Sequence, residues 1–149
     1  MAQPVAPTVR FEFLEHKADA YIAAYGTSLE QCFENAGLAL FETMTDTGKV
    51  AKTVEEEVQV SGRDEVGLLY SWLERLLVMF ETGGNLYSCF KVLEIQRTED
   101  GYCLRARVWG EPFNPAVHVQ KTEVKAITYH QMEIVEENGM VVARFILDL

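Results

Sequence analysis

The chain has 149 residues, 48% of them hydrophobic and 24% charged, which is the composition of an ordinary globular protein with one domain. Acidic residues outnumber basic ones 23 to 13, and the formal net charge is −10. Tight binding to nucleic acid requires basic side chains against the phosphates, so this charge argues against direct binding to RNA or DNA. It favours a protein partner with a basic surface, or a bound cation.

The ends and cysteines of the chain narrow the class of protein further. No apolar run approaches the roughly 20 residues that cross a bilayer, and the N-terminus lacks the pattern of a signal peptide. We therefore expect no membrane interaction and a cytoplasmic location. We expect residues 1–8 to form a flexible tail and residues 9–149 to form a single domain. Cys32, Cys89 and Cys103 show neither disulfide nor zinc spacing and are interpreted as packed thiols.

The first half of the chain predicts the order β-β-α-β-α. Alternation of apolar and polar side chains indicates strands, and apolar side chains at helical spacing indicate helices. Ser28 and Asp64 have the side chains of helix N-caps, and Gly83-Gly84 is typical of a helix end. The expected elements are residues 9–14, 19–25, 29–44, 54–60 and 65–82.

The second half predicts four strands in two hairpins. Asp100-Gly101 and Asn138-Gly139 are strong hairpin turns. The expected strands are residues 86–96, 102–109, 123–135 and 140–148, with an exposed loop at 110–121. The fold class is therefore α+β: one mainly antiparallel or mixed sheet with two helices packed on one face, in the order β-β-α-β-α-β-β-β-β.

Three consecutive acidic residues lie in the third expected strand. Glu55 and Glu57 fall on its polar face and are interpreted as solvent-facing side chains rather than metal ligands. Glu56 falls on the apolar face, where a charge that discourages pairing with another strand is one explanation.

A polar break, Glu15-His16-Lys17-Ala18-Asp19-Ala20, lies between the first two expected strands. Such a segment is either a solvated turn or a functional one. At the other end of the chain, the last strand places the side chain of Asp148 next to the α-carboxylate of Leu149. If the two segments meet in a sheet, three anionic groups converge. A hard divalent cation would then relieve their repulsion.

Lys125 and two histidines are further candidates. On the expected strand 123–135, Lys125 shares a face with Ile127 and Tyr129 and would seek a carboxylate partner, or serve as an edge lysine. His16 and His130 have side chains suited to acid/base chemistry. However, no Ser or Cys stands in a recognisable nucleophile motif.

Four separated motifs resemble the archease family, and the likeness runs from about Phe11 to Leu149. They are His16-Lys17-Ala18-Asp19-Ala20, Phe41-Glu42-Thr43-Met44-Thr45-Asp46, Thr122-Glu123-Val124-Lys125-Ala126-Ile127-Thr128-Tyr129 and Ile146-Leu147-Asp148-Leu149.

The resemblance implies a function in tRNA splicing. Proteins of this family assist an RtcB-type RNA ligase, promoting its GTP-dependent guanylylation and its multiple turnover, and are not ligases themselves. The resemblance also implies a divalent cation site made by Asp19, Asp148 and Leu149, with Ca²⁺ favoured over Mg²⁺ or Mn²⁺. Lys125 would act in ligase activation rather than as a ligand.

Three positions depart from the family pattern. Glu15 and Lys17 replace the usual Asp and Thr, and Lys121 stands where glycine is common. Lys17 would lie two residues from a metal ligand and could weaken cation binding. Two other functions remain open on the sequence alone: a metal-dependent hydrolase that uses Asp19, Asp148 and His16 as base, and a small binding module whose carboxylates are structural.

Overall fold

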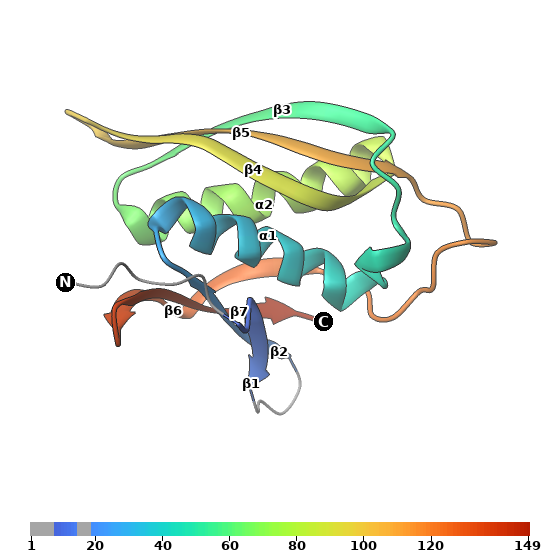
Figure 1. The fold of residues 1–149 in the computed structure, drawn as a ribbon, viewed down its shortest axis with the longest axis horizontal. Helices are drawn as coiled ribbons and strands as arrows, with labels where there is room; N and C mark the ends of the chain where they lie inside the picture. Colours follow the sequence, from blue (N-terminus) through green and yellow to red (C-terminus); the bar gives the residue numbers. More distant parts are fainter. Residues whose placement is uncertain (1–7, 15–18) are drawn as a thin grey trace.

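Strands and helices are arranged in three layers in the computed structural model, which describes residues 8–14 and 19–149. The middle layer holds two helices, and a sheet lies on either side of it (Figure 1). The elements in chain order are β1 (Phe11–Leu14), β2 (Ala20–Gly26), α1 (Leu29–Met44), η1 (Thr47–Lys49, a 3-10 helix), β3 (Val54–Gly62), α2 (Glu65–Gly83), β4 (Asn85–Thr98), β5 (Gly101–Pro112), β6 (Ala126–Glu137) and β7 (Met140–Asp148).

The predicted α+β class is confirmed, and the strands form two sheets rather than one. Sheet A has the order β1-β2-β7-β6, and sheet B has the order β3-β5-β4. Every paired strand in both sheets is antiparallel. The first and last hairpins join in sheet A, while β3 joins the middle hairpin in sheet B. Each sheet turns one apolar face to the helices, and local patterns cannot show which hairpins share a sheet.

Both helices start and end where the sequence predicts. The Ser28 hydroxyl accepts a hydrogen bond from the Gln31 amide at 3.1 Å, and Asp64 accepts one from the Gly67 amide at 2.7 Å. At the end of α2, Gly84 has φ of +78°, which glycine adopts without strain. Because α2 lies between two sheets, it buries one apolar stripe, formed by Leu68, Leu69, Trp72, Leu73, Leu76 and Leu77. The Trp72 indole of this stripe donates to the Phe33 carbonyl of α1 at 2.9 Å.

Glu56 has a structural partner on the inward face of β3. Its carboxylate accepts a hydrogen bond from the hydroxyl of Tyr87, whose side chain is fully buried. Burial and this carboxylate together raise the pKa of Tyr87. Glu56 is therefore the acceptor that satisfies a buried phenol, which the alternation of β3 could not reveal. On the outer face, Glu55 pairs with Arg107 at 3.6 Å.

The largest differences from the predicted element boundaries are at the end of β5 and the start of β6. The loop expected at 110–121 begins later, because β5 continues to Pro112. Gly110 is a ladder residue rather than a strand breaker: a Cβ built there would lie 1.7 Å from the Leu86 carbonyl oxygen of β4. The strand expected at 123–135 begins at Ala126 and ends at Glu137, so residues 123–125 are outside it.

Some predictions fall on parts of the chain that the structure does not describe. The expected tail is described only at Thr8, and the turn that contains Glu15, His16 and Lys17 lies outside the described residues. All three cysteines are free thiols, as predicted. No helix within residues 8–14 and 19–149 is long and apolar enough to cross a membrane.

Candidate functional site

The predicted site residues meet at one end of sheet A. Ala20 of β2 pairs with Leu147 of β7, so continuing the antiparallel pairing by one residue sets Asp19 beside Asp148. On the other side of β7, Ala126 pairs with Asp148, and the Lys125 amide donates to the Asp148 carbonyl at 2.7 Å. Pairing between strands from both ends of the chain thus brings Asp19, Asp148, Leu149 and Lys125 together. We call this the carboxylate end of sheet A.

The donors at the carboxylate end are oxygens. Asp19 and Leu149 are half-buried, and Asp148 is exposed. No three His, Cys, Asp or Glu side chains gather as a metal-binding group in the described part of the chain. A third anionic donor would therefore have to be the α-carboxylate of Leu149. Two side-chain carboxylates and a terminal carboxylate match the all-oxygen preference of Ca²⁺ or Mg²⁺.

Lys125 differs from its sequence prediction in position. It lies one residue before β6, so it does not share a strand face with Ile127 and Tyr129 as expected. Its side chain is exposed, and its main chain is fixed to β7 by the bond to Asp148. An exposed ammonium beside Asp148 is suited to contact another molecule.

Neither His118 nor His130, the two histidines that the structure describes, belongs to the carboxylate end. His130 is exposed in β6, within the irregular pairing between Thr128 and Glu133, and its amide donates to the Thr128 hydroxyl. His16 falls outside the described residues. Of the two histidines that the structure describes, only His118, which lies in the segment expected to be an exposed loop, is buried, at 3% exposure.

His118 anchors the segment that follows β5. Its Nδ1 accepts a hydrogen bond from the Asn114 amide at 2.9 Å, which requires the proton on Nε2. That nitrogen lies 2.8 Å from Glu111, whose carboxylate also accepts from the Ala51 amide. The Ala51 and His118 hydrogen bonds lower the pKa of Glu111. The segment expected to be an exposed loop is therefore fixed by hydrogen bonds to the buried His118.

A hollow of about 520 Å³ lies between the C-terminal ends of α1 and α2 and residues 113–124, and we call it the helix-end hollow. Its apolar lining consists of Met44, Phe80, Leu86, Phe113 and Val124. Its exposed charged lining consists of Glu81, Lys121 and Glu123. Two of the four sequence motifs, residues 41–46 and 122–129, thus contribute to one concave surface. Its lining extends to Val124, the residue before Lys125.

Hydrogen bonds between α1 and the neighbouring segment hold the helix-end hollow together. The Lys121 amide donates to the Met44 carbonyl at 3.0 Å, and the Lys121 ammonium contacts the Glu42 carboxylate at 2.5 Å. The Thr45 hydroxyl donates to the Val119 carbonyl at 2.8 Å. Lys121, which replaces a common glycine, therefore has a partner in this chain.

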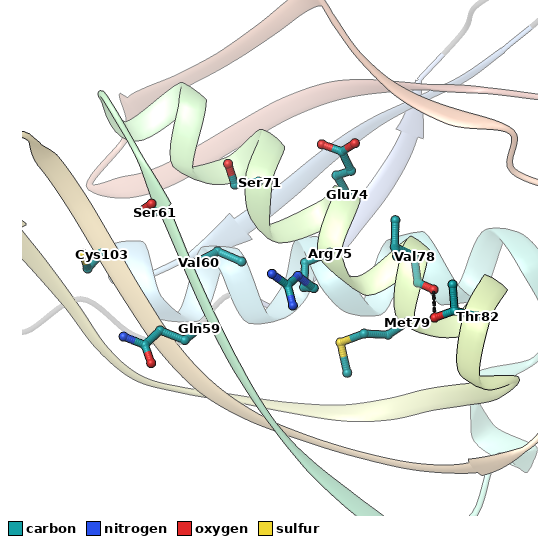
Figure 2. A pocket seen from close by; sticks show the side chains of 10 residues that line it. All are labelled: Gln59, Val60, Ser61, Ser71, Glu74, Arg75, Val78, Met79, Thr82 and Cys103. Atoms are coloured by element: carbon teal, nitrogen blue, oxygen red, sulfur yellow. Dashed lines mark hydrogen bonds between the residues drawn. The ribbon is translucent and has the colours of Figure 1, made fainter.

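A larger hollow, about 730 Å³, lies between α2 and β3. Figure 2 shows Val60 from β3 and Arg75 from α2 in the space between these elements. Its charged lining residues are Glu74 and Arg75, and it includes none of the predicted site residues. The α2–β3 hollow therefore has no net charge and lies apart from the carboxylate end.

The sequence named the residues at the carboxylate end and did not indicate the helix-end hollow. Glu81 belongs to α2 and Leu86 to β4, and neither lies in one of the four motifs that resemble the archease family. The two motifs that flank the hollow were a usable signal, yet their contact depends on the tertiary fold. His118 gave no signal, because a histidine in a polar loop is normally exposed.

Comparison with known proteins gives consistent results. Residues 11–149 match the model of the Archease protein family (MTH1598/TM1083). The chain is 45% identical to the protein archease of Sulfolobus acidocaldarius over 94% of this chain and 99% of that protein. It is 47% identical to the protein archease of Methanothermobacter thermautotrophicus, over 93% and 98% respectively.

Solved structures agree with this fold. The solution structure of Methanobacterium thermoautotrophicum protein 1598 is similar with a TM-score of 0.80 and 43% identity, covering 94% of this chain and 99% of that one. The crystal structure of an archease, described as a possible chaperone, from Thermotoga maritima has a TM-score of 0.61 and 19% identity, covering 100% and 98%. The second likeness supports the fold alone.

Proposed function

Because this chain belongs to the Archease family, we propose that it activates an RtcB-type RNA ligase in tRNA splicing and is not itself an enzyme. In this proposal it promotes the GTP-dependent guanylylation of the ligase and its multiple turnover. A protein that works beside such a ligase would be cytoplasmic.

The observation that carries the proposal is the carboxylate end of sheet A. The pairing of β7 with β2 and β6 sets Ala20 beside Leu147 and Ala126 beside Asp148, which supports a site made by Asp19, Asp148, Leu149 and Lys125 from both ends of the chain. Asp148 and Lys125 are exposed there, where a partner protein can reach them. The net charge of −10 supports docking to a basic groove in an RNA-binding enzyme.

The proposal includes a divalent cation, Ca²⁺ in preference to Mg²⁺ or Mn²⁺, at this end of the sheet. Asp19, Asp148 and the α-carboxylate of Leu149 would hold it. The cation would neutralise converging negative charges and present a positive centre beside Lys125. Lys125 would contact the ligase or its nucleotide rather than the cation.

The direct experiment adds purified protein to an RtcB-type ligase with GTP and measures the guanylylated fraction and the number of turnovers. We expect both to rise with the wild-type protein, and to fall to near the ligase-alone level with Asp19→Ala, Asp148→Ala or Lys125→Ala. The first two variants should also lose affinity for Ca²⁺ by calorimetry, whereas Lys125→Ala should retain it.

A matched control is Asp100→Ala, which removes one exposed carboxylate at the turn between β4 and β5 and should behave as the wild type. No effect of the wild-type protein on guanylylation or turnover would end the proposal. Phosphoesterase activity of the protein alone, abolished by Asp19→Asn, would support a hydrolase instead. Unchanged cation affinity in both aspartate variants would remove the metal assignment.

A further inference from the structure

We infer that the helix-end hollow is the docking site for an apolar side chain of the ligase that is flanked by a basic residue. This inference rests on the proposed function, since it assigns a surface to the same partner. It gives a role to the motif at residues 41–46, which the carboxylate end does not use.

The base of the hollow is apolar and open to a side chain from outside. Met44 and Val124 are 8% and 3% exposed, and Leu86 is 1% exposed, so they form a floor that belongs to the core. Phe80 and Phe113 are half-buried and form its sides. The volume of about 520 Å³ lies within the range of about 300–1,000 Å³ that is usual for binding pockets.

The charge around the hollow selects the partner. Glu81 and Glu123 are both exposed. The one ammonium of the lining, Lys121, is neutralised by Glu42. The rim therefore presents a net negative charge, which attracts a Lys or Arg beside the apolar anchor. The same charge repels nucleic-acid phosphates, and it repels a second copy of this chain, whose net charge is also −10.

The main chain at the rim can also contact a partner. Residues 122–124 are not part of a strand. Within the described residues, no hydrogen bond reaches the main-chain groups of Thr122 or Glu123. An extended segment of a partner can pair with such groups while its side chain fills the hollow.

The hollow is held open by bonds within this chain. The Phe113 amide donates to the Gly84 carbonyl at 2.8 Å, and the Phe113 ring stacks on His118 with centroids 6.1 Å apart. On the opposite side, Lys121 is bound to Met44 and Glu42. A site whose walls are already ordered loses less conformational entropy on binding.

The test measures the affinity of the purified ligase for full-length variants by calorimetry at low and high salt. Glu81→Lys and Glu123→Lys each reverse one exposed rim charge and should weaken binding about tenfold, with a loss that shrinks as salt rises. Thr122→Trp, which places a large side chain at the mouth of the hollow, should weaken binding at every salt concentration.

Glu99→Lys is the matched control, because it makes the same charge change at the β4–β5 turn. This turn follows the end of β4, whereas the hollow is lined by Leu86 near the start of the same strand. It should bind within about twofold of the wild type. Asp148→Asn separates docking from activation: it should bind the ligase and fail to raise guanylylation.

Two results would overturn the inference in different ways. Wild-type affinity in Glu81→Lys, Glu123→Lys and Thr122→Trp, with normal activation by the wild-type protein, would remove the docking site and leave the proposed function standing. Absence of both binding and activation by the wild-type protein would remove the proposed function, and the inference with it. A thermal melt of each variant verifies that it is folded.

Discussion

Sheets A and B are both antiparallel, but their polar side chains differ in where they lie and in the partners they have. In sheet B the polar side chains satisfy one another, since Tyr87 binds Glu56 across the sheet and Arg107 pairs with Glu55. In sheet A, Arg144 binds Glu133 and Glu137, away from the end where Asp148 is exposed. Both sheets therefore pair charged side chains, and sheet A in addition gathers carboxylates at one end.

The way each sheet is assembled explains this difference. The β4–β5 hairpin of sheet B forms locally around Asp100-Gly101, and β3 adds to it. Sheet A instead joins β2 near the start of the chain to β7 at its end. A site built from both chain ends exists only when the whole domain is folded. We therefore expect substitutions in sheet B to change stability and substitutions at the carboxylate end to change function.

The largest expected effect on stability is in sheet B. Tyr87→Ala removes a fully buried ring and the hydroxyl that binds Glu56, and should lower the free energy of unfolding by about 3–5 kcal/mol. Tyr87→Phe is the matched variant: it keeps the ring, leaves Glu56 without this donor, and should cost about 1–3 kcal/mol. Urea denaturation measures both. Loss of ligase activation in the folded fraction of Tyr87→Phe would contradict the proposed division between the sheets.

A smaller effect is expected at the Glu42–Lys121 contact, which links α1 to the segment leading into sheet A. Burial raises the pKa of Glu42, but hydrogen bonds from Lys121 and Thr47 outweigh it, so the pKa lies below its ordinary value of 4.5. The folded protein therefore binds this proton less readily than the unfolded chain. The ionised Glu42 carboxylate therefore stabilises the folded protein fully at pH values above its ordinary pKa. This stabilisation is lost as the pH falls through the lowered pKa of the folded state.

The measurement compares wild type with Glu42→Gln by denaturation at neutral and acidic pH. At neutral pH the wild type should be more stable by under about 1 kcal/mol, as is usual for partly exposed ion pairs. The difference should shrink as the medium becomes acidic. A difference that stays constant with pH would show that the Glu42 charge does not stabilise this junction.

The smallest effect on stability is expected at the carboxylate end. Asp148→Asn removes one of the converging negative charges from an exposed position, and without added cation it should change the free energy of unfolding by no more than about 0.5 kcal/mol. Added Ca²⁺ should raise the melting temperature of the wild type and not that of the variant. A large loss of stability in Asp148→Asn without cation would favour the structural role that the sequence left open.

Local sequence determined most of the fold elements. The N-caps Ser28 and Asp64, the helix end at Gly84 and the turn at Asn138-Gly139 are all where their side-chain chemistry predicts, because each depends on neighbours along the chain. The alternation of Glu55 to Glu57 predicted their faces for the same reason. The start of β6 could not be predicted, since residues 123–125 carry a strand-like pattern but lie beyond the end of β7, where the bond from the Lys125 amide to the Asp148 carbonyl is the last one described.

The tertiary structure decided what the residues do together. The sequence by itself named Asp19, Asp148, Leu149 and Lys125, and only the pairing of β7 with β2 on one side and β6 on the other brings their segments to one end of sheet A. Pairing between strands more than a hundred residues apart depends on which apolar faces cover the two helices, and that is a property of the whole core. The partner of Glu56 was likewise decided by a contact between strands distant in the sequence. His118 is held by the nearby Glu111, whose carboxylate also accepts a hydrogen bond from the distant Ala51 amide.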